Sequence, residues 1–144
     1  MGDNRDRIEL WLADKVPGAS FDDAGTASVQ RDPDTVVVLE LSPAKDICHF
    51  CALVAPLSEE MPEASLFAAL ELNRFGKPLG GCWLAWEPDL QMLPLNWNLV
   101  LADADDFAFG NALDNFISAI DTARAELLPA PAERESGRSV VEMA

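Results

Sequence analysis

Apolar residues recur at intervals of three and four in three parts of the chain, and this spacing predicts three amphipathic helices. The first is expected at residues 3–15, before Pro17-Gly18, and the second at residues 58–74. The third follows the acidic run at residues 103–106, which suits the positive end of a helix. The apolar positions are Ile8, Trp11 and Leu12, then Leu66, Phe67, Leu70 and Phe75, then Phe109, Leu113, Phe116, Ile117, Ile120 and Leu127.

Segments rich in β-branched and aromatic residues, bounded by turn residues, predict five strands. Short polar connections between the first three favour antiparallel pairing. In the last strand, apolar residues alternate with Pro94, Asn96 and Asn98, as expected for a strand with one buried face. The five expected ranges are residues 27–31, 35–41, 47–56, 82–86 and 92–101.

The resulting order of elements is α-β-β-β-α-β-β-α. It predicts an α+β fold in which three helices flank an antiparallel twisted sheet. A chain of 144 residues is expected to form one domain, which we assign to residues 1–128. Residues 129–144 contain Pro, Glu, Arg and Ser without periodicity, so we predict a disordered C-terminal tail.

The charge balance excludes several classes of partner. The chain has 25 acidic and 10 basic residues, a net charge of −15, and its Lys and Arg residues are scattered singly. Such a surface repels phosphate backbones and anionic lipids, so neither nucleic-acid nor membrane binding is expected. No apolar signal segment begins the sequence, and no apolar run is long enough for a membrane span. We therefore expect a cytoplasmic protein, and its odd number of cysteines, three, fits a reducing compartment.

The segment Cys48-His49-Phe50-Cys51 is the first candidate for chemistry, because a C-x-x-C pair beside a histidine can bind zinc or cycle between redox states. On a strand, however, residues three apart point to opposite faces, so the two thiols should diverge. Cys82 is the only other thiol. We therefore interpret all three cysteines as structural and His49 as a half-buried strand residue, and we expect no metal.

The stretch from Asn73 to Trp86 is the second candidate, because Gly76 and the pair Gly80-Gly81 resemble a phosphate-binding loop. Such loops run from a strand into the positive end of a helix. Here the order is helix, glycines, strand, so the helix would turn its negative end to the loop. We interpret Gly76 as the residue that ends the helix, and Gly80-Gly81 as the turn before the next strand.

No nucleophile motif of the G-x-S-x-G type and no H-E-x-x-H motif is present. The acidic run at residues 103–106 lacks the spacing of a calcium-binding loop, and helix capping explains it better. We therefore expect neither an enzyme nor a cofactor.

Taken in order, several segments resemble the class I chaperones of type III secretion, the Tir-chaperone or Syc-like family. That family has a helix ending in Leu-x-x-Asn-x-x-Gly, glycines leading into a strand, a second strand with a Pro-Leu pair, and a final acidic-capped helix with a Phe-x-x-x-Leu-x-x-Phe stripe. The resemblance covers about residues 3–128. The corresponding segments are Leu70 to Gly76, Gly80 to Leu84, Leu93-Pro94-Leu95 and Phe109 to Phe116.

The resemblance implies a cytoplasmic bacterial homodimer without enzymatic activity. It would bind an extended N-terminal segment of a secreted effector, keep that segment soluble and export-competent, and deliver it to the secretion apparatus. Client binding would involve the first helix and the strands, and the dimer interface the second helix and the strand after it. The implied client-binding residues are Ile8, Trp11, Leu12, Val37, Leu39 and Phe50, and the implied dimer-interface residues are Leu66, Phe67, Leu70, Phe75, Trp83 and Trp86.

Two other functions remain open at this point. One is a regulatory or protein-interaction domain of the same fold that serves no secretion system. The other is a small enzyme centred on Cys51 or His49.

Overall fold

The computed structural model describes residues 2–42, 46–56, 62–74 and 78–127. Its elements follow the predicted order, and the α+β class is confirmed. The predicted tail and the helix start at residues 58–61 lie outside the described residues. The elements are α1 (Gly2–Lys15), β1 (Thr26–Asp32), β2 (Thr35–Ser42), β3 (Ile47–Pro56), α2 (Pro62–Leu72), β4 (Trp83–Leu84), β5 (Met92–Val100) and α3 (Asp106–Leu127).

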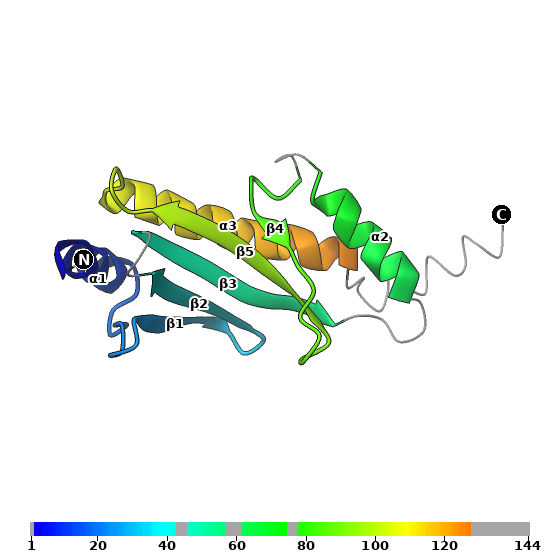
Figure 1. The fold of residues 1–144 in the computed structure, drawn as a ribbon, viewed down its shortest axis with the longest axis horizontal. Coiled ribbons are helices and arrows are strands. Elements are labelled where there is room, and N and C mark those ends of the chain that lie inside the picture. Colours follow the sequence, from blue (N-terminus) through cyan, green and yellow to red (C-terminus); the bar gives the residue numbers. More distant parts are fainter. Residues whose placement is uncertain (1, 43–45, 57–61, 75–77, 128–144) are drawn as a thin grey trace.

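The five strands form one antiparallel sheet in the order β1-β2-β3-β5-β4 (Figure 1). β3 and β5 form its centre and pair along almost their whole length, from Ile47↔Val100 to Pro56↔Met92. β1 and β4 are therefore the two edges, on opposite sides of the sheet. β4 is shorter than the predicted strand 82–86, because the regular ladder with β5 covers Trp83 and Leu84 alone. Beyond it, contact with β5 continues through the Ala85 amide, which donates to the Pro94 carbonyl, and through an isolated bridge between Glu87 and Met92.

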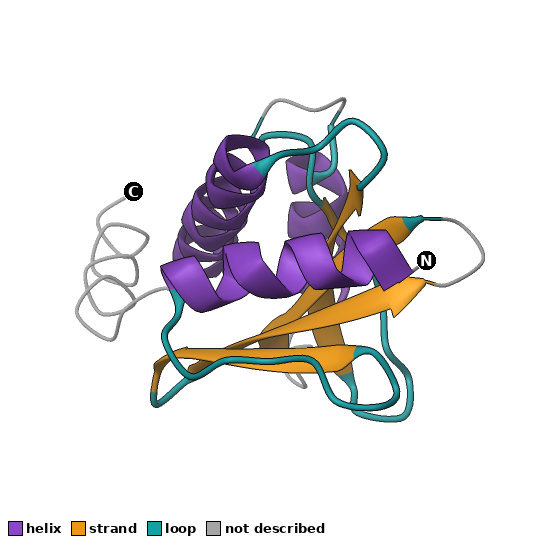
Figure 2. Ribbon diagram, turned by 90° about the vertical axis from the view of Figure 1, so that its left-hand side faces the viewer, coloured by secondary structure: helices purple, strands orange, loops and turns teal. Residues whose placement is uncertain are grey.

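All three helices lie on one side of the sheet (Figure 2). α3 crosses the centre of that face, where Phe109 and Phe116 pack against Phe50 of β3 with ring centroids 6.1 and 5.6 Å apart. These three phenylalanines are fully buried. Alternation along the strands places one set of side chains in this core and the other on the open face, as the pattern predicts.

The acidic run before α3 is a helix cap, as predicted. The carboxylate of Asp105 accepts a hydrogen bond of 2.7 Å from the Ala108 amide, and its carbonyl accepts one from Phe109. A carboxylate at this position satisfies an otherwise unpaired amide and faces the positive end of the helix.

The glycine pair forms the predicted turn. Gly80 and Gly81 have φ angles of 61° and 96°, which other residues rarely adopt. A Cβ on Gly80 would lie 2.6 Å from the Asn115 amide oxygen, and one on Gly81 would lie 3.0 Å from the Trp97 ring. The glycines therefore permit close contact with α3 and β5. Gly76 lies outside the described residues.

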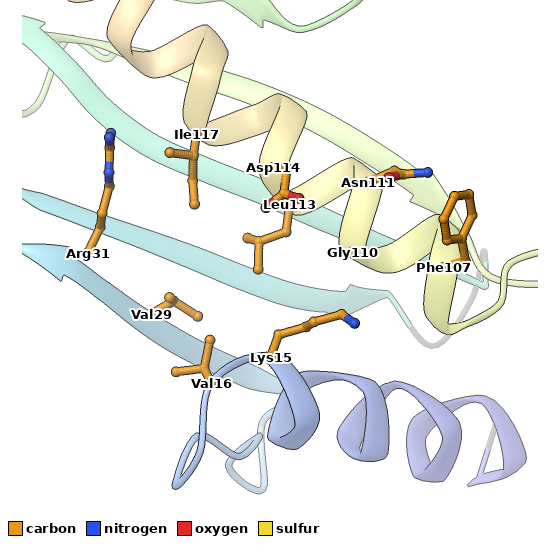
Figure 3. A pocket seen from close by; sticks show the side chains of 10 residues that line it. All are labelled: Lys15, Val16, Val29, Arg31, Phe107, Gly110, Asn111, Leu113, Asp114 and Ile117. Carbon is orange, nitrogen blue, oxygen red and sulfur yellow. The ribbon is translucent and has the colours of Figure 1, made fainter.

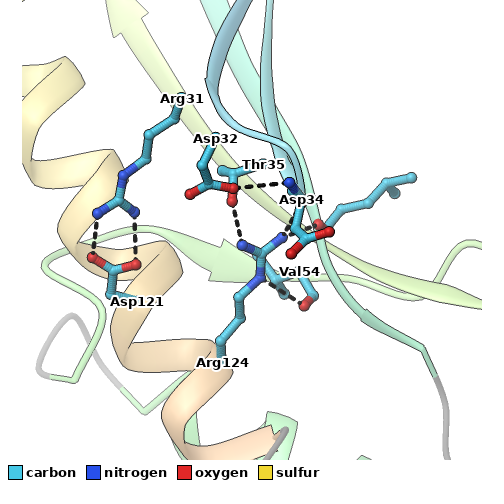
Figure 4. A network of polar contacts seen from close by, with 8 residues as sticks. Arg31, Asp32, Asp34, Thr35, Val54, Asp121 and Arg124 are labelled. Carbon is cyan, nitrogen blue, oxygen red and sulfur yellow. Dashed lines mark hydrogen bonds and ion pairs between the residues drawn. The ribbon is translucent and has the colours of Figure 1, made fainter.

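Arg124 attaches the last turns of α3 to the sheet (Figure 4). Its guanidinium donates to the carbonyls of Val54, Leu53 and Asp34 at 3.1, 3.2 and 2.9 Å, and also to the Thr35 hydroxyl. Thr35 is a buried polar residue, so this contact satisfies its hydroxyl. One side chain thus fixes α3 against both the β1–β2 turn and β3.

Candidate binding surfaces

Five of the six predicted client-binding residues are core residues. Ile8, Leu12, Val37, Leu39 and Phe50 each have 0% exposed surface. A side chain without accessible surface cannot contact a bound chain in this conformation. The periodicity of these residues correctly identifies apolar faces of a helix and of strands, but the rest of the domain covers those faces.

Trp11 is the one predicted client-binding residue that keeps part of its surface. Its ring packs against Phe109 at a centroid distance of 6.1 Å, and the Arg7 guanidinium lies 5.0 Å from the ring centroid. Arg7 also donates to the Ala104 carbonyl. Trp11 therefore helps join α1 to the start of α3.

A groove lined by both apolar and charged residues lies between the end of α1, the edge strand β1 and α3 (Figure 3). Its volume is about 400 Å³. Side chains from all three elements point into it, and Phe107, which is 76% exposed, stands at one end. The groove is lined by Lys15, Val16, Val29, Arg31, Phe107, Gly110, Asn111, Leu113, Asp114 and Ile117.

We call this the α1–β1–α3 groove. Its two basic side chains, Lys15 and Arg31, both form ion pairs with aspartates of α3. Lys15 lies 3.6 Å from Asp106 and 3.3 Å from Asp14. Arg31 makes two bonds to Asp121, at 2.6 and 2.9 Å, and these lower the pKa of the aspartate. The groove walls are thereby tied together at both ends.

The second surface is an exposed apolar face on α2 and the segment after β4. Leu66, Phe67 and Leu70 are 40, 64 and 65% exposed, and Trp86 is 41% exposed. All four belong to the predicted dimer interface; Phe75 belongs to it too but lies outside the described residues. A groove of about 280 Å³ runs through this surface, lined by Leu66, Ala69, Leu70, Asn73, Leu84, Ala85, Trp86 and Leu93.

Asn73 connects the two sides of this α2–β4 surface. Its amide nitrogen donates to the Leu84 carbonyl at 2.9 Å, and its amide oxygen accepts from the Leu84 amide at 2.7 Å. The side chain thus pairs with the edge strand as a neighbouring strand would. The sequence marked Asn73 only as a motif position, because neither its role nor its partner is visible from spacing.

Trp83 and Trp86, predicted together at the dimer interface, lie on opposite faces of the sheet edge. Trp86 lines the α2–β4 groove, whereas Trp83 is opposite Asn96 on the open face and lies 6.4 Å from the His49 ring. Residues three apart on a strand point to opposite faces, so the predicted strand at residues 82–86 already implies this separation. The joint placement at the dimer interface came from the family resemblance, which did not take this alternation into account.

The cysteines diverge as predicted. Cys48 is buried on the helix-covered face, whereas Cys51 pairs with Val38 and Asn96 on the open face. Burial raises the pKa of Cys48 to about 12 and that of Cys82 to about 11. Burial, together with the charge of Glu40, also raises the pKa of Cys51. These thiols stay protonated and weakly nucleophilic at neutral pH.

His49 is half-buried on the open face, as predicted. Its Nδ1 lies 2.6 Å from the Asn98 amide oxygen and its Nε2 lies 3.1 Å from that of Asn96. Both ring nitrogens thus face amide groups of the neighbouring strand. Within the described residues, no three His, Cys, Asp or Glu side chains gather in a way that would hold a metal ion.

The structure adds residues that sequence reasoning did not select, above all Val16, Phe107 and Ile117 around the α1–β1–α3 groove. Ile117 was assigned to the buried stripe of α3, and the other two adjoin helix ends. No periodicity distinguishes them, because the groove arises from the separation of three elements.

Among the described helices, none is sufficiently long and apolar to cross a membrane.

Solved structures share this fold. The ExsC–ExsE complex matches with a TM-score of 0.70 and 18% identity over 88% of this chain and 98% of the other. The type III secretion chaperone SycH of Yersinia pestis, solved with a fragment of YscM2, matches with a TM-score of 0.64 and 17% identity. The match covers 83% of this chain and 98% of the other. YbjN from E. coli matches with a TM-score of 0.57 and 17% identity, over 90% of this chain and 92% of the other. At these identities the likeness concerns the fold.

Comparison with curated protein sequences gives no significant match. A family model, in contrast, matches residues 9–124, which includes the second half of α1, the whole sheet, α2 and nearly all of α3. The match agrees with the resemblance carried by the Asn73, glycine-pair and α3 motifs. The chain belongs to the Tir chaperone protein (CesT) family.

Proposed function

We propose that this chain is a non-enzymatic, cytoplasmic chaperone of bacterial type III secretion. It binds the N-terminal segment of a secreted effector as a homodimer, keeps that segment soluble and export-competent, and presents it to the secretion apparatus. The observation that carries this proposal is the presence of two separate apolar surfaces at the opposite edges of one sheet. One adjoins β1 and the other adjoins β4.

The α1–β1–α3 groove is the client-binding surface in this proposal. It combines apolar walls with an edge strand that has no further strand partner among the described residues. An extended client segment can insert side chains into such a groove and add backbone hydrogen bonds to the strand edge. The proposed contact positions are Val16, Phe107 and Ile117, in place of the client-binding residues from the sequence that are buried in the core. Trp11, half-buried nearby on α1, is retained.

The α2–β4 surface is the dimer interface in this proposal. Its exposed leucines and aromatic residues lie on the outer side of α2, where a monomeric helix normally carries polar residues. Exposed apolar patches of this kind are typical of protein–protein contacts. Leu66, Phe67, Leu70 and Trp86 are retained from the prediction, and Trp83 contributes only if the contact extends to the open face.

Co-expression tests the proposal. The chain is produced with the full-length product of a neighbouring gene that has a secretion-type N-terminus, and then with truncations of that product. We expect co-purification that requires the N-terminal segment, and light scattering should give two copies of this chain per complex. Binding that instead requires a folded C-terminal domain, or a monomeric chain at micromolar concentration, would contradict the proposal and favour a regulatory interaction domain.

A further inference from the structure

The charges around the α1–β1–α3 groove are unevenly paired. Lys15 and Arg31 are both compensated by carboxylates of this chain, Lys15 by Asp14 and Asp106, Arg31 by Asp121. Asp114 also lines the groove, but none of the described residues forms a hydrogen bond or ion pair with its carboxylate. The groove therefore contains one negative charge that its own walls do not neutralise.

The position of Asp114 makes this charge relevant to an occupant. It lies on α3 between Phe107 and Ile117, one turn before the isoleucine, and Figure 3 places it beside Leu113 at the apolar wall. The ten steps along the helix from Phe107 to Ile117 span roughly 15 Å, which an extended segment covers with about five residues. Apolar contacts therefore lie on both sides of the carboxylate within a short stretch of client.

An occupant of the groove displaces water from Asp114. A carboxylate that loses its hydration without gaining a partner is strongly disfavoured, whereas a cation at hydrogen-bond distance compensates it. Lys15 and Arg31 are held by other carboxylates, so the compensating cation must come from the occupant. The net charge of −15 also attracts basic segments and repels acidic ones over longer distances.

We propose that Asp114 selects the client. The client segment that fills the α1–β1–α3 groove carries a Lys or Arg with apolar residues on both sides, all within a stretch of about five residues. The basic side chain pairs with Asp114 while the apolar side chains contact Val16, Phe107 and Ile117. This inference rests on the proposed function, because it specifies the chemistry of the segment that the groove binds.

A displayed library of random 12-residue peptides tests the proposal against the purified full-length chain. We expect selected peptides to contain Lys or Arg flanked by apolar residues. The bias should be lost in Asp114→Asn and reversed towards Asp or Glu in Asp114→Lys. Asp114 is exposed, so both variants should fold, which circular dichroism verifies. Asp89→Asn removes the same charge from an exposed turn at the other edge of the sheet and should keep the bias.

Affinities of a selected peptide make the test quantitative. Replacing its basic residue by Glu should weaken binding to the wild type about tenfold or more, and Asp114→Lys should restore it. Equal basic enrichment in wild type and Asp114→Asn, or enrichment without basic residues, overturns the role of Asp114 while groove binding stands. If the wild type enriches no peptide beyond those that an Ile117→Asp variant enriches, groove binding itself fails, and both proposals fail with it.

Discussion

The two apolar surfaces differ in charge. The α1–β1–α3 groove is lined by two cations and a carboxylate among its apolar residues, whereas none of the described residues that line the α2–β4 groove is charged. A twofold-symmetric contact brings identical patches together, so any charge near its axis meets a like charge. In a chain of net charge −15, an uncharged surface is therefore the one suited to self-association. A charged groove suits a different partner, whose charges can be complementary.

The surfaces also differ in how they are fastened. The walls of the α1–β1–α3 groove are joined by two ion pairs, and Arg124 fixes the same helix to the sheet. The α2–β4 surface depends on the amide of Asn73 and on the small buried side of α2, which offers Ala69 and Leu72. In the proposed function, the groove is therefore shaped before a client arrives, whereas the exposed apolar side of α2 is buried only by the second copy of the chain.

The largest effect is expected from Leu70→Asp. A carboxylate placed in an apolar contact without a partner is strongly disfavoured, so dimerisation should weaken about 100-fold or more. Sedimentation equilibrium measures the mass at micromolar concentration. Leu10→Asp, at a position of α1 that is 72% exposed and lines neither groove, is the matched control and should leave the dimer intact. A dimeric Leu70→Asp would show that the interface lies elsewhere.

Ile117→Asp should give the reverse result. The new carboxylate lies in the wall of the α1–β1–α3 groove, so client affinity should fall about tenfold or more, while the dimer mass stays unchanged. Isothermal titration with the client segment measures the affinity. Ser118→Asp adds the same charge at an exposed neighbouring position outside the groove lining and should bind normally. Equal losses in both variants would contradict a role of the groove.

Asn73→Ala should reduce the free energy of unfolding by about 1–3 kcal/mol, because it removes both hydrogen bonds to Leu84 and leaves those backbone groups without a partner. Urea denaturation measures this change. Asn111→Ala removes an exposed amide of α3 and should change stability little. If the two variants were equally stable, Asn73 would not fasten α2 to the sheet edge.

The smallest effect is expected from Asp121→Asn, which breaks the exposed ion pair to Arg31. The pair lowers the pKa of Asp121, so it stabilises the folded state at pH values above the ordinary aspartate pKa of about 3.9. That stabilisation is lost as the pH falls through the lowered pKa. The melting temperatures of wild type and variant should therefore differ slightly at pH 7 and converge at acidic pH. A gap that widens on acidification would contradict this.

Residues with regular spacing were placed well from the sequence. The third strand was predicted at residues 47–56 and is observed at Ile47–Pro56, and the stripe of α3 enters the core at Phe109 and Phe116. The residues that contact a client were harder to predict from the sequence. Ile8 and Phe50 were predicted to contact a client, yet both are buried, because periodicity identifies an apolar face without showing what covers it.

By itself, the sequence determined the order of elements, the antiparallel α+β class, the divergence of Cys48 and Cys51, and the acidic cap of α3. Each of these follows from local rules: side-chain periodicity, backbone freedom and the helix dipole. Only the tertiary structure decided which apolar faces remain exposed, which cations are already paired, and that Asp114 stands without a partner among the described residues. Those properties depend on contacts between segments far apart in the chain, which no local pattern encodes.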